Sequence, residues 1–151
     1  MACAKLQEYL DGENVRYVLM RHSPAFTAQE VAAAAHIPGQ EVAKVVVVKL
    51  DGEMALVVLP APEMIRMNHL KAETGAQEVE LATEEEFKGR FPDCEVGAMP
   101  PFGNLYGMET MVEESLTEDE DIAFNAGTHT ELVRMAYEDF ERLVQPRVLA
   151  G

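Results

Sequence analysis

The chain has 151 residues, of which 48% are hydrophobic and 26% charged, a composition typical of one folded domain and not of a disordered segment. Twelve basic against 27 acidic residues give a formal net charge of −15, which argues against nucleic-acid binding through a broad basic surface. No apolar run approaches the roughly 20 residues of a transmembrane helix, and the N-terminal residues lack the apolar core of a secretory signal. We therefore expect a single domain over residues 1–151 in the reducing cytoplasm, with no membrane contact.

The first third of the chain predicts a helix, a strand and a second helix. Apolar residues at helical spacing, followed by Asp11-Gly12, indicate a helix over residues 2–13. Residues 16–21 are rich in strand-forming side chains and precede a break at Pro24. Thr27 and Glu30 have capping-box spacing, which predicts a helix over residues 28–35.

The strongest local pattern is a β-hairpin. Two apolar, β-branched runs over residues 42–50 and 53–60 flank Asp51-Gly52, a pair that favours a type I′ turn. Because both runs are apolar almost throughout, we expect both faces of this hairpin to be covered. The hairpin is predicted to form the core of the sheet.

The remaining pattern mixes helices and strands without regular alternation. Another capping box, at Thr83 and Glu86, opens a brief helix that ends near residue 89. The order predicts an α+β fold built on a mixed sheet or barrel. Further helices are expected over residues 68–74 and 137–144, and strands over residues 77–81, 109–116, 121–125 and 131–135.

The segment over residues 95–103 is a stiff loop. Gly97 and Gly103 bracket Pro100 and Pro101, so the segment fits neither a regular helix nor a central strand. Its few backbone N–H groups point in fixed directions, which suits close approach to a ligand, although such loops also serve as simple connections.

Elimination leaves no obvious side-chain nucleophile. The two serines, Ser23 and Ser115, are not in a Gly-x-Ser-x-Gly elbow, and acidic neighbours on both sides of Cys94 would raise its pKa. The cysteines, Cys3 and Cys94, have neither metal-site spacing nor partners for a disulfide framework. We expect no metal or cofactor, and any catalysis would rely on oriented electrostatics.

Two polar side chains are candidates for chemistry. Lys44 interrupts an apolar strand, so it either snorkels to water or faces a ligand oxyanion or phosphate. Lys49, five positions on, should face the opposite side and be solvated. His129 lies in a turn over residues 127–130, where a structural role and a functional role are both open, as for His22. Phe26 and Phe102 are expected to pack in the core.

Four stretches, over residues 22–27, 42–47, 96–103 and 124–132, together resemble the YbaK/prolyl-tRNA synthetase-associated domain family. The resemblance runs from about residue 17 to residue 144. It implies a mixed β-sheet curled into a barrel with flanking helices, and hydrolysis of mischarged aminoacyl-tRNA.

The resemblance also implies roles for residues. Lys44 would hold the terminal phosphate or the carbonyl, backbone N–H groups of Gly97 and Ala98 would stabilise the oxyanion, and His129 would orient the aminoacyl end. The ribose hydroxyl of the terminal adenosine would position water, so no protein nucleophile is required. The implied substrate-contacting residues are Met20, His22, Phe26, Thr27, Met99, Pro101, Phe102, Gly127 and Thr128.

Two departures from the family bear on the substrate. Met20 stands where its cysteinyl-tRNA deacylases carry tyrosine, and Leu132 stands near a position of aspartate. These departures favour alanine or another small amino acid over cysteine. We expect a small amino acid such as alanine or cysteine on tRNA-Pro, with prolyl-tRNA synthetase as a partner. The alternatives are a non-catalytic binding module for tRNA, a nucleotide or a synthetase, which the charge of −15 favours, and an enzyme that depends on Cys94.

Overall fold

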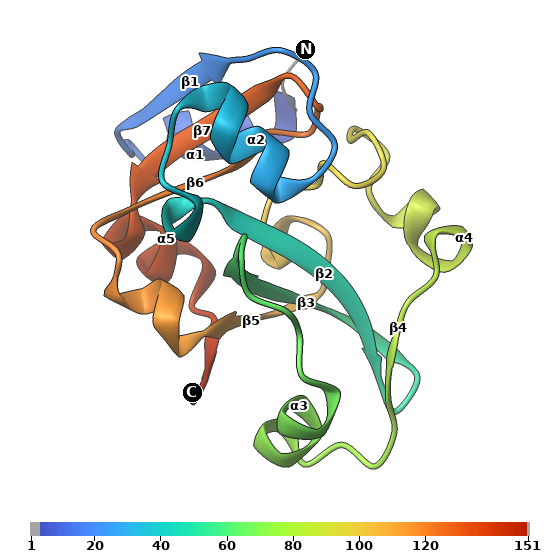
Figure 1. The fold of residues 1–151 in the computed structure, drawn as a ribbon. Helices are drawn as coiled ribbons and strands as arrows, with labels where there is room; N and C mark the ends of the chain where they lie inside the picture. The colour runs from blue at the N-terminus through green and yellow to red at the C-terminus, as the bar shows by residue number, and fades with distance from the viewer. Residues whose placement is uncertain (1–3, 151) are drawn as a thin grey trace.

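Two β-sheets form the framework of the protein (Figure 1). The structure, a computed structural model, describes residues 4–150, so Cys3 and the first residues of the expected N-terminal helix lie outside it. The smaller sheet has the order β1-β7-β6, and the larger has the order β4-β2-β3-β5-β8. The strands are β1 (Tyr17–Arg21), β2 (Ala43–Leu50), β3 (Glu53–Pro60), β4 (Val79–Leu81), β5 (Glu109–Glu113), β6 (Asp121–Asn125), β7 (Glu131–Ala136) and β8 (Arg147–Leu149).

The expectation of a sheet curled into a barrel is wrong; the fold is α+β with two open sheets. A closed barrel needs each strand to be hydrogen-bonded on both sides. Among the described residues, one isolated bridge, between Val42 and Ala123, joins the two sheets. The chain leaves β5 at Glu113, passes through the 3₁₀ helix Glu114–Glu118 and enters β6 in the other sheet. This change of sheet interrupts the ladder that a barrel would continue.

The β2–β3 hairpin is confirmed as the centre of the larger sheet. Its register pairs Val46 with Val57, and the positive φ values of Asp51 (50°) and Gly52 (88°) are those of a type I′ turn. Side chains on one face pack with Leu70 of the helix α3, and those on the other face pack with Phe91 and its neighbours. Both faces are thus covered, as the continuous apolar runs predict.

The helices follow the local signals closely. They are α1 (Ala4–Gly12), α2 (Ala28–Ala35), α3 (Met67–Thr74), α4 (Glu84–Phe87) and α5 (Tyr137–Val144). The capping boxes at Thr27 and Thr83 are both present. The sequence missed β8, a three-residue strand beside β5, and extended β5 into the 3₁₀ helix. Within residues 4–150, no helix combines the length and apolar character that crossing a bilayer requires.

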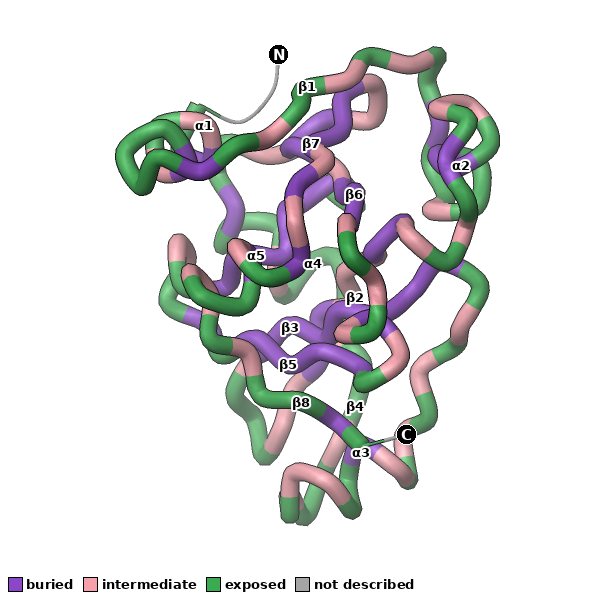
Figure 2. Tube along the Cα trace, turned by 90° about the vertical axis from the view of Figure 1, so that its left-hand side faces the viewer, coloured by how far each residue is buried: buried purple, intermediate pink, exposed green. Residues whose placement is uncertain are grey.

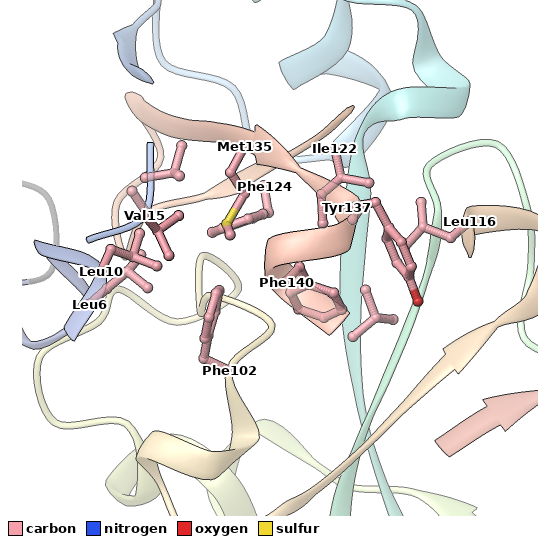
Figure 3. Packing of buried hydrophobic residues seen from close by; sticks show 14 of the residues in the cluster. Leu6, Leu10, Val15, Phe102, Leu116, Ile122, Phe124, Met135, Tyr137 and Phe140 are labelled. Carbon is pink, nitrogen blue, oxygen red and sulfur yellow. The ribbon is translucent and has the colours of Figure 1, made fainter. Parts of the chain in front are cut away.

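The main core lies between α1, α5 and the two sheets (Figure 3). Phe102 is its centre: its ring centroid is 5.5 Å from those of Phe124 and Phe140 and 6.1 Å from that of Tyr9. A second cluster forms where α2 covers the opposite face of the smaller sheet, and it includes Leu132. Buried residues run through the middle of both sheets (Figure 2), whereas α4 lies at the edge of the molecule (Figure 1) and its residues are mostly exposed. Phe102 thereby anchors the loop that precedes β5 to the smaller sheet.

Candidate functional site

The turn between β6 and β7 lies against the loop over residues 95–103, called here the glycine–proline loop. The N–H of Glu95 donates to the carbonyl of Gly127 at 2.7 Å, and the N–H of Gly127 donates to the carbonyl of Ala98 at 2.9 Å. Within the loop, the N–H of Ala98 donates to the carbonyl of Glu95 at 3.0 Å. These backbone hydrogen bonds fix the position of the loop against the turn that carries His129.

The imidazole of His129 is held from two sides. Its Nε2 lies 3.0 Å from the carbonyl oxygen of Val96, and its backbone N–H donates to Oε1 of Glu95 at 2.6 Å. A carbonyl oxygen only accepts, so Nε2 carries a hydrogen. Nδ1 is buried and has no partner among residues 4–150. The ring is therefore fixed, with one buried nitrogen that no described protein group satisfies.

Gly97 lies directly beneath this ring. Its φ of +88° belongs to the left-handed region, and a Cβ at this position would be 3.5 Å from Cε1 of His129. Its N–H points at Sδ of Met99, 3.2 Å away, a weak acceptor that a ligand oxygen could replace. Ala98 differs because it is fully buried and its N–H already donates to Glu95. Of the two predicted backbone donors, Gly97 is the one placed to serve a ligand.

Phe26 forms a wall beside His129 and is not a core residue. Its side chain is 68% exposed, and its ring centroid is 4.7 Å from that of His129 at an angle of 46°. The expectation that Phe26 packs in the core is wrong, since Pro24 and Ala25 direct this segment over the β6–β7 turn, where the N–H of Ala25 donates to the carbonyl of His129 at 3.1 Å. A large exposed aromatic ring beside a fixed imidazole can stack on a planar ligand.

His22 follows β1 and precedes the segment that carries Phe26. Its backbone N–H donates to the carbonyl of Thr130 at 2.9 Å, and its Nδ1 lies 2.7 Å from the carbonyl of Ser23. Its Nε2 is buried without a partner in the described part of the chain, as is Oδ1 of Asn125 at the end of β6. Three buried polar atoms without a hydrogen-bond partner in the described part of the chain, from His22, Asn125 and His129, therefore lie in or next to this turn.

Lys44 lies in a neighbouring groove. The groove has a volume of about 350 Å³ and is lined by Thr27 and Gln29 at the start of α2 and by Ala61, Pro62 and Met64 after β3. Burial lowers the pKa of Lys44, and the charge of Glu63 opposes this shift. Gly97 does not line this groove. The structure therefore brings His129, Gly97 and Phe26 together, whereas Lys44 lines a groove to which none of these three residues contributes.

Most of the other residues that were expected to contact the substrate are buried. Phe102 is fully buried in the main core and has no surface for a ligand, which confirms its expected core position. Met99 packs against Val47 and Leu56 of the hairpin. The hydroxyl of Thr128 donates to Oε1 of Glu131 at 3.3 Å. Pro101 and Gly127 are also buried, while Met20 is half-buried beneath α2.

The sequence missed Glu95 and Val96 as site residues. Both residues belong to the loop over residues 95–103 but were given no role, yet the carboxylate of Glu95 accepts from the backbone N–H of His129 across 34 positions. No local pattern reveals a contact over that separation. Cys94 itself is half-buried, with Sγ 3.4 Å from the hydroxyl of Tyr106. Within residues 4–150, no group of three or more histidine, cysteine, aspartate and glutamate side chains is arranged to hold a metal ion.

Comparison with known proteins gives one family and several related folds. Residues 22–143 match the model of a family described as the aminoacyl-tRNA editing domain. A hypothetical protein of known structure has a TM-score of 0.85 and 21% identity, with 97% of each chain covered. The crystal structure of a proposed trans-editing enzyme for prolyl-tRNA synthetase has a TM-score of 0.81 and 19% identity, covering 97% of this chain and 93% of that one.

A proposed signal transduction protein from Marinobacter aquaeolei VT8 contains the same fold in a longer chain. The match has a TM-score of 0.72 and 18% identity, and it covers 97% of this chain but 29% of that one. No curated protein sequence matches significantly. At these identities the solved structures establish the fold alone.

Proposed function

The chain belongs to the aminoacyl-tRNA editing domain family, as the resemblance to the YbaK family indicated, and from this premise we propose that it hydrolyses the ester bond of mischarged aminoacyl-tRNA. The reaction adds water to the ester carbonyl and releases the amino acid from the ribose of the terminal adenosine. The proposal extends to the cytoplasm as the site of action, because tRNA is charged there.

The observation that carries this proposal is the fixed imidazole of His129, held through Nε2 by the carbonyl of Val96, next to Gly97, where a Cβ would lie 3.5 Å from Cε1 of the ring. Water attack places negative charge on the carbonyl oxygen, and we propose that the N–H of Gly97, whose acceptor in the structure is the weak Sδ of Met99, stabilises that charge. Loss of one such donor typically lowers the rate about 100- to 1000-fold. We propose that the imidazole of His129, fixed next to Gly97, orients the aminoacyl end of the substrate.

Lys44 and Phe26 extend the site toward the nucleotide. We place the terminal phosphate in the groove of Lys44, where the start of α2 adds backbone dipoles of favourable sign. Phe26 lies between this groove and His129 and offers its exposed ring to the adenine. In this arrangement the protein supplies donors and charge, and a ribose hydroxyl helps to position water.

The proposed substrate carries a small amino acid, alanine or cysteine, on tRNA-Pro. Met99, Pro101 and Phe102 of the loop are all buried, so they offer no open surface for a large side chain. A synthetase separates amino acids that differ by one methylene only about 10- to 200-fold, so errors with small amino acids require a second hydrolytic site. The structural neighbour described for prolyl-tRNA synthetase supports the choice of tRNA.

The net charge of −15 makes unaided tRNA binding weak, because long-range repulsion opposes the approach of a polyanion. We therefore propose that prolyl-tRNA synthetase presents the acceptor end. A binding module without catalysis is the second candidate, and this charge is the observation that favours it.

The test is a panel of mischarged tRNAs, incubated with the protein alone and with prolyl-tRNA synthetase. We expect hydrolysis of at least one tRNA that carries a small amino acid, and a large loss of rate in Lys44→Ala. Lys49→Ala is the matched control, because Lys49 lies on the same strand but pairs with Glu80 and Glu86 instead of facing the groove. Binding without hydrolysis would favour the binding module, and equal rates for Lys44→Ala and wild type would refute the role of Lys44.

A further inference from the structure

A second pocket lies at the other end of the smaller sheet, away from His129. It has a volume of about 530 Å³, and its walls come from the link between the 3₁₀ helix Glu114–Glu118 and β6 and from the junction of β7 with α5. Asp121 and Ala136 pair at this end of the two strands, whereas the β6–β7 turn joins their other ends. The length of β6 therefore separates the pocket from the candidate site.

The lining of this pocket is acidic. Among the described residues that line it, five carry a carboxylate and none carries a positive charge. Within residues 4–150, Asp121 is the one with an ion pair, since Nη2 of Arg134 lies 3.9 Å from its Oδ2 and 2.9 Å from Oε1 of Glu41. Glu138 lies in the first turn of α5, where the helix dipole favours a negative charge. The five carboxylates are those of Asp119, Glu120, Asp121, Glu138 and Glu141.

The hydroxyl group of Tyr137 is an independent indication of a ligand. The residue is 4% exposed, and its ring packs in the main core with its centroid 5.7 Å from that of Phe140. Figure 3 shows the hydroxyl oxygen at the edge of this core, on the side away from Phe102. The oxygen is buried and has no hydrogen-bond partner in the described part of the chain. Burial raises the pKa of Tyr137 to about 12, and the charge of Glu141 on the pocket wall adds to this shift. The neutral hydroxyl can therefore both accept and donate a hydrogen bond at the pocket.

Asp119 contributes a second unsatisfied atom to the same lining. Its Oδ2 is buried and has no hydrogen-bond partner within residues 4–150. The backbone around it is fixed, because the N–H of Asp119 donates to the carbonyl of Leu116 at 3.2 Å and the N–H of Tyr137 donates to the carbonyl of Glu120 at 2.9 Å. Burial raises the pKa of Asp119, and nearby acidic charges raise it further. Two buried oxygens on a rigid frame thus share one pocket, and buried polar atoms are normally paired.

We propose that this pocket binds a linear polyamine, an organic cation with several ammonium groups. The ammonium N–H groups donate to carboxylates of the lining, among them Oδ2 of Asp119, and the hydroxyl oxygen of Tyr137 accepts one more hydrogen bond. Several positive charges on one chain match a lining with several negative charges, and the volume lies within the range of small-molecule sites. A metal ion fits less well, because no group of three or more histidine, cysteine, aspartate and glutamate side chains in the described residues is arranged to hold one.

The first experiment measures spermidine binding by isothermal titration calorimetry at physiological ionic strength. We expect saturable binding to the wild-type protein and about tenfold weaker binding to Tyr137→Phe, because a hydrogen bond to a charged group is lost while the ring and the net charge stay the same. Asp119→Asn should weaken binding at least as much. Glu118→Gln is the matched control, since Glu118 is the exposed neighbour of Asp119 and does not line the pocket. Equal affinity of Tyr137→Phe and wild type, or equal losses in Asp119→Asn and Glu118→Gln, overturns the proposal.

The second experiment locates the ligand and identifies the chemistry that is recognised. In amide NMR spectra, which also show whether each variant is folded, spermidine should shift the signals of residues 117–121 and 136–141 and leave those of residues 95–103 unchanged. Permethylated spermidine has the same charges without N–H donors, and we expect no saturable binding. Equal binding of the permethylated compound, or shifts confined to residues 95–103, contradicts the proposal. Tighter binding of tetralysine than of spermidine would assign the pocket to a basic protein segment and overturn the choice of a polyamine. Neither measurement depends on deacylase activity.

Discussion

The β2–β3 hairpin and the β6–β7 turn differ in how completely their buried groups find partners within the protein. The hairpin is covered on both faces, and Leu56 to Leu59 are fully buried among apolar neighbours. At the turn and the strand ends beside it, buried polar atoms of His22, Asn125 and His129 have no partner in the described part of the chain; three other such atoms, of His69, Asp119 and Tyr137, lie elsewhere. Buried polar atoms are normally paired, so unpaired ones gathered in one place indicate where a ligand completes the structure.

This difference predicts two kinds of mutational response. Changes in the packed framework should lower the free energy of unfolding, because every lost contact leaves a void. Changes at the turn and its facing loop should lower activity with a smaller effect on stability. The glycine–proline loop tests the division, since Gly97 belongs to the site and Phe102 belongs to the core.

The largest expected effect is that of Phe102→Ala. Three aromatic rings surround this fully buried side chain, so its removal should lower the free energy of unfolding by about 3–5 kcal/mol. Urea denaturation followed by circular dichroism measures the change. Phe26→Ala is the control: its ring is 68% exposed, and the cost should stay within about 0.5 kcal/mol. Similar costs for both variants would break the distinction between framework and site.

Both glycines of the loop should lose stability when replaced by alanine, but for different physical reasons. A Cβ at Gly103 would be 2.4 Å from Oγ1 of Thr110 and 2.6 Å from the carbonyl oxygen of Met108, so Gly103→Ala forces the backbone to move and should cost about 1–3 kcal/mol of stability. Gly97→Ala meets no such obstacle and should cost about 1–2 kcal/mol through its left-handed φ.

The deacylation rates of these two variants should differ in the opposite sense: Gly97→Ala should lose more activity than Gly103→Ala. Gly97→Ala turns the proposed donor away from the ester and should lower the deacylation rate about 100-fold or more. Gly103→Ala should retain most of the rate per folded molecule. Thermal unfolding and single-turnover deacylation of both variants provide the comparison, and a greater loss of rate in Gly103→Ala would contradict it.

The smallest expected effect concerns Glu113, a buried carboxyl within the framework. Burial raises its pKa in the folded state, with smaller contributions from the charges around it. A raised pKa means that the folded state holds the proton more tightly. The favourable contribution is therefore complete below the unfolded pKa and is lost as the pH rises through the folded pKa.

Glu113→Gln should consequently raise the Tm at pH 7 and leave it nearly unchanged at pH 4. Differential scanning calorimetry at the two pH values measures this difference. Glu114→Gln, at an exposed position next in the chain, serves as the control and should change little at either pH. A stabilisation of Glu113→Gln that is equal at both pH values would show that packing, not titration, is responsible.

The amino-acid sequence by itself determined the elements that rest on local signals. The type I′ hairpin, the capping boxes at Thr27 and Thr83 and the amphipathic helix α5 all follow from residues within a few positions of one another. The four stretches that identify the family are likewise short. Dihedral preferences and hydrophobic periodicity act over this range, so they can be seen before folding.

Only the tertiary structure decided how these elements meet. It replaced the expected barrel with two open sheets, exposed Phe26, and separated the groove of Lys44 from Gly97. It also joined Glu95 to His129 across 34 positions. Such contacts depend on which strands pair and where the chain changes sheets, and that outcome is set by burial and hydrogen bonding over the whole molecule, which no short stretch of residues encodes.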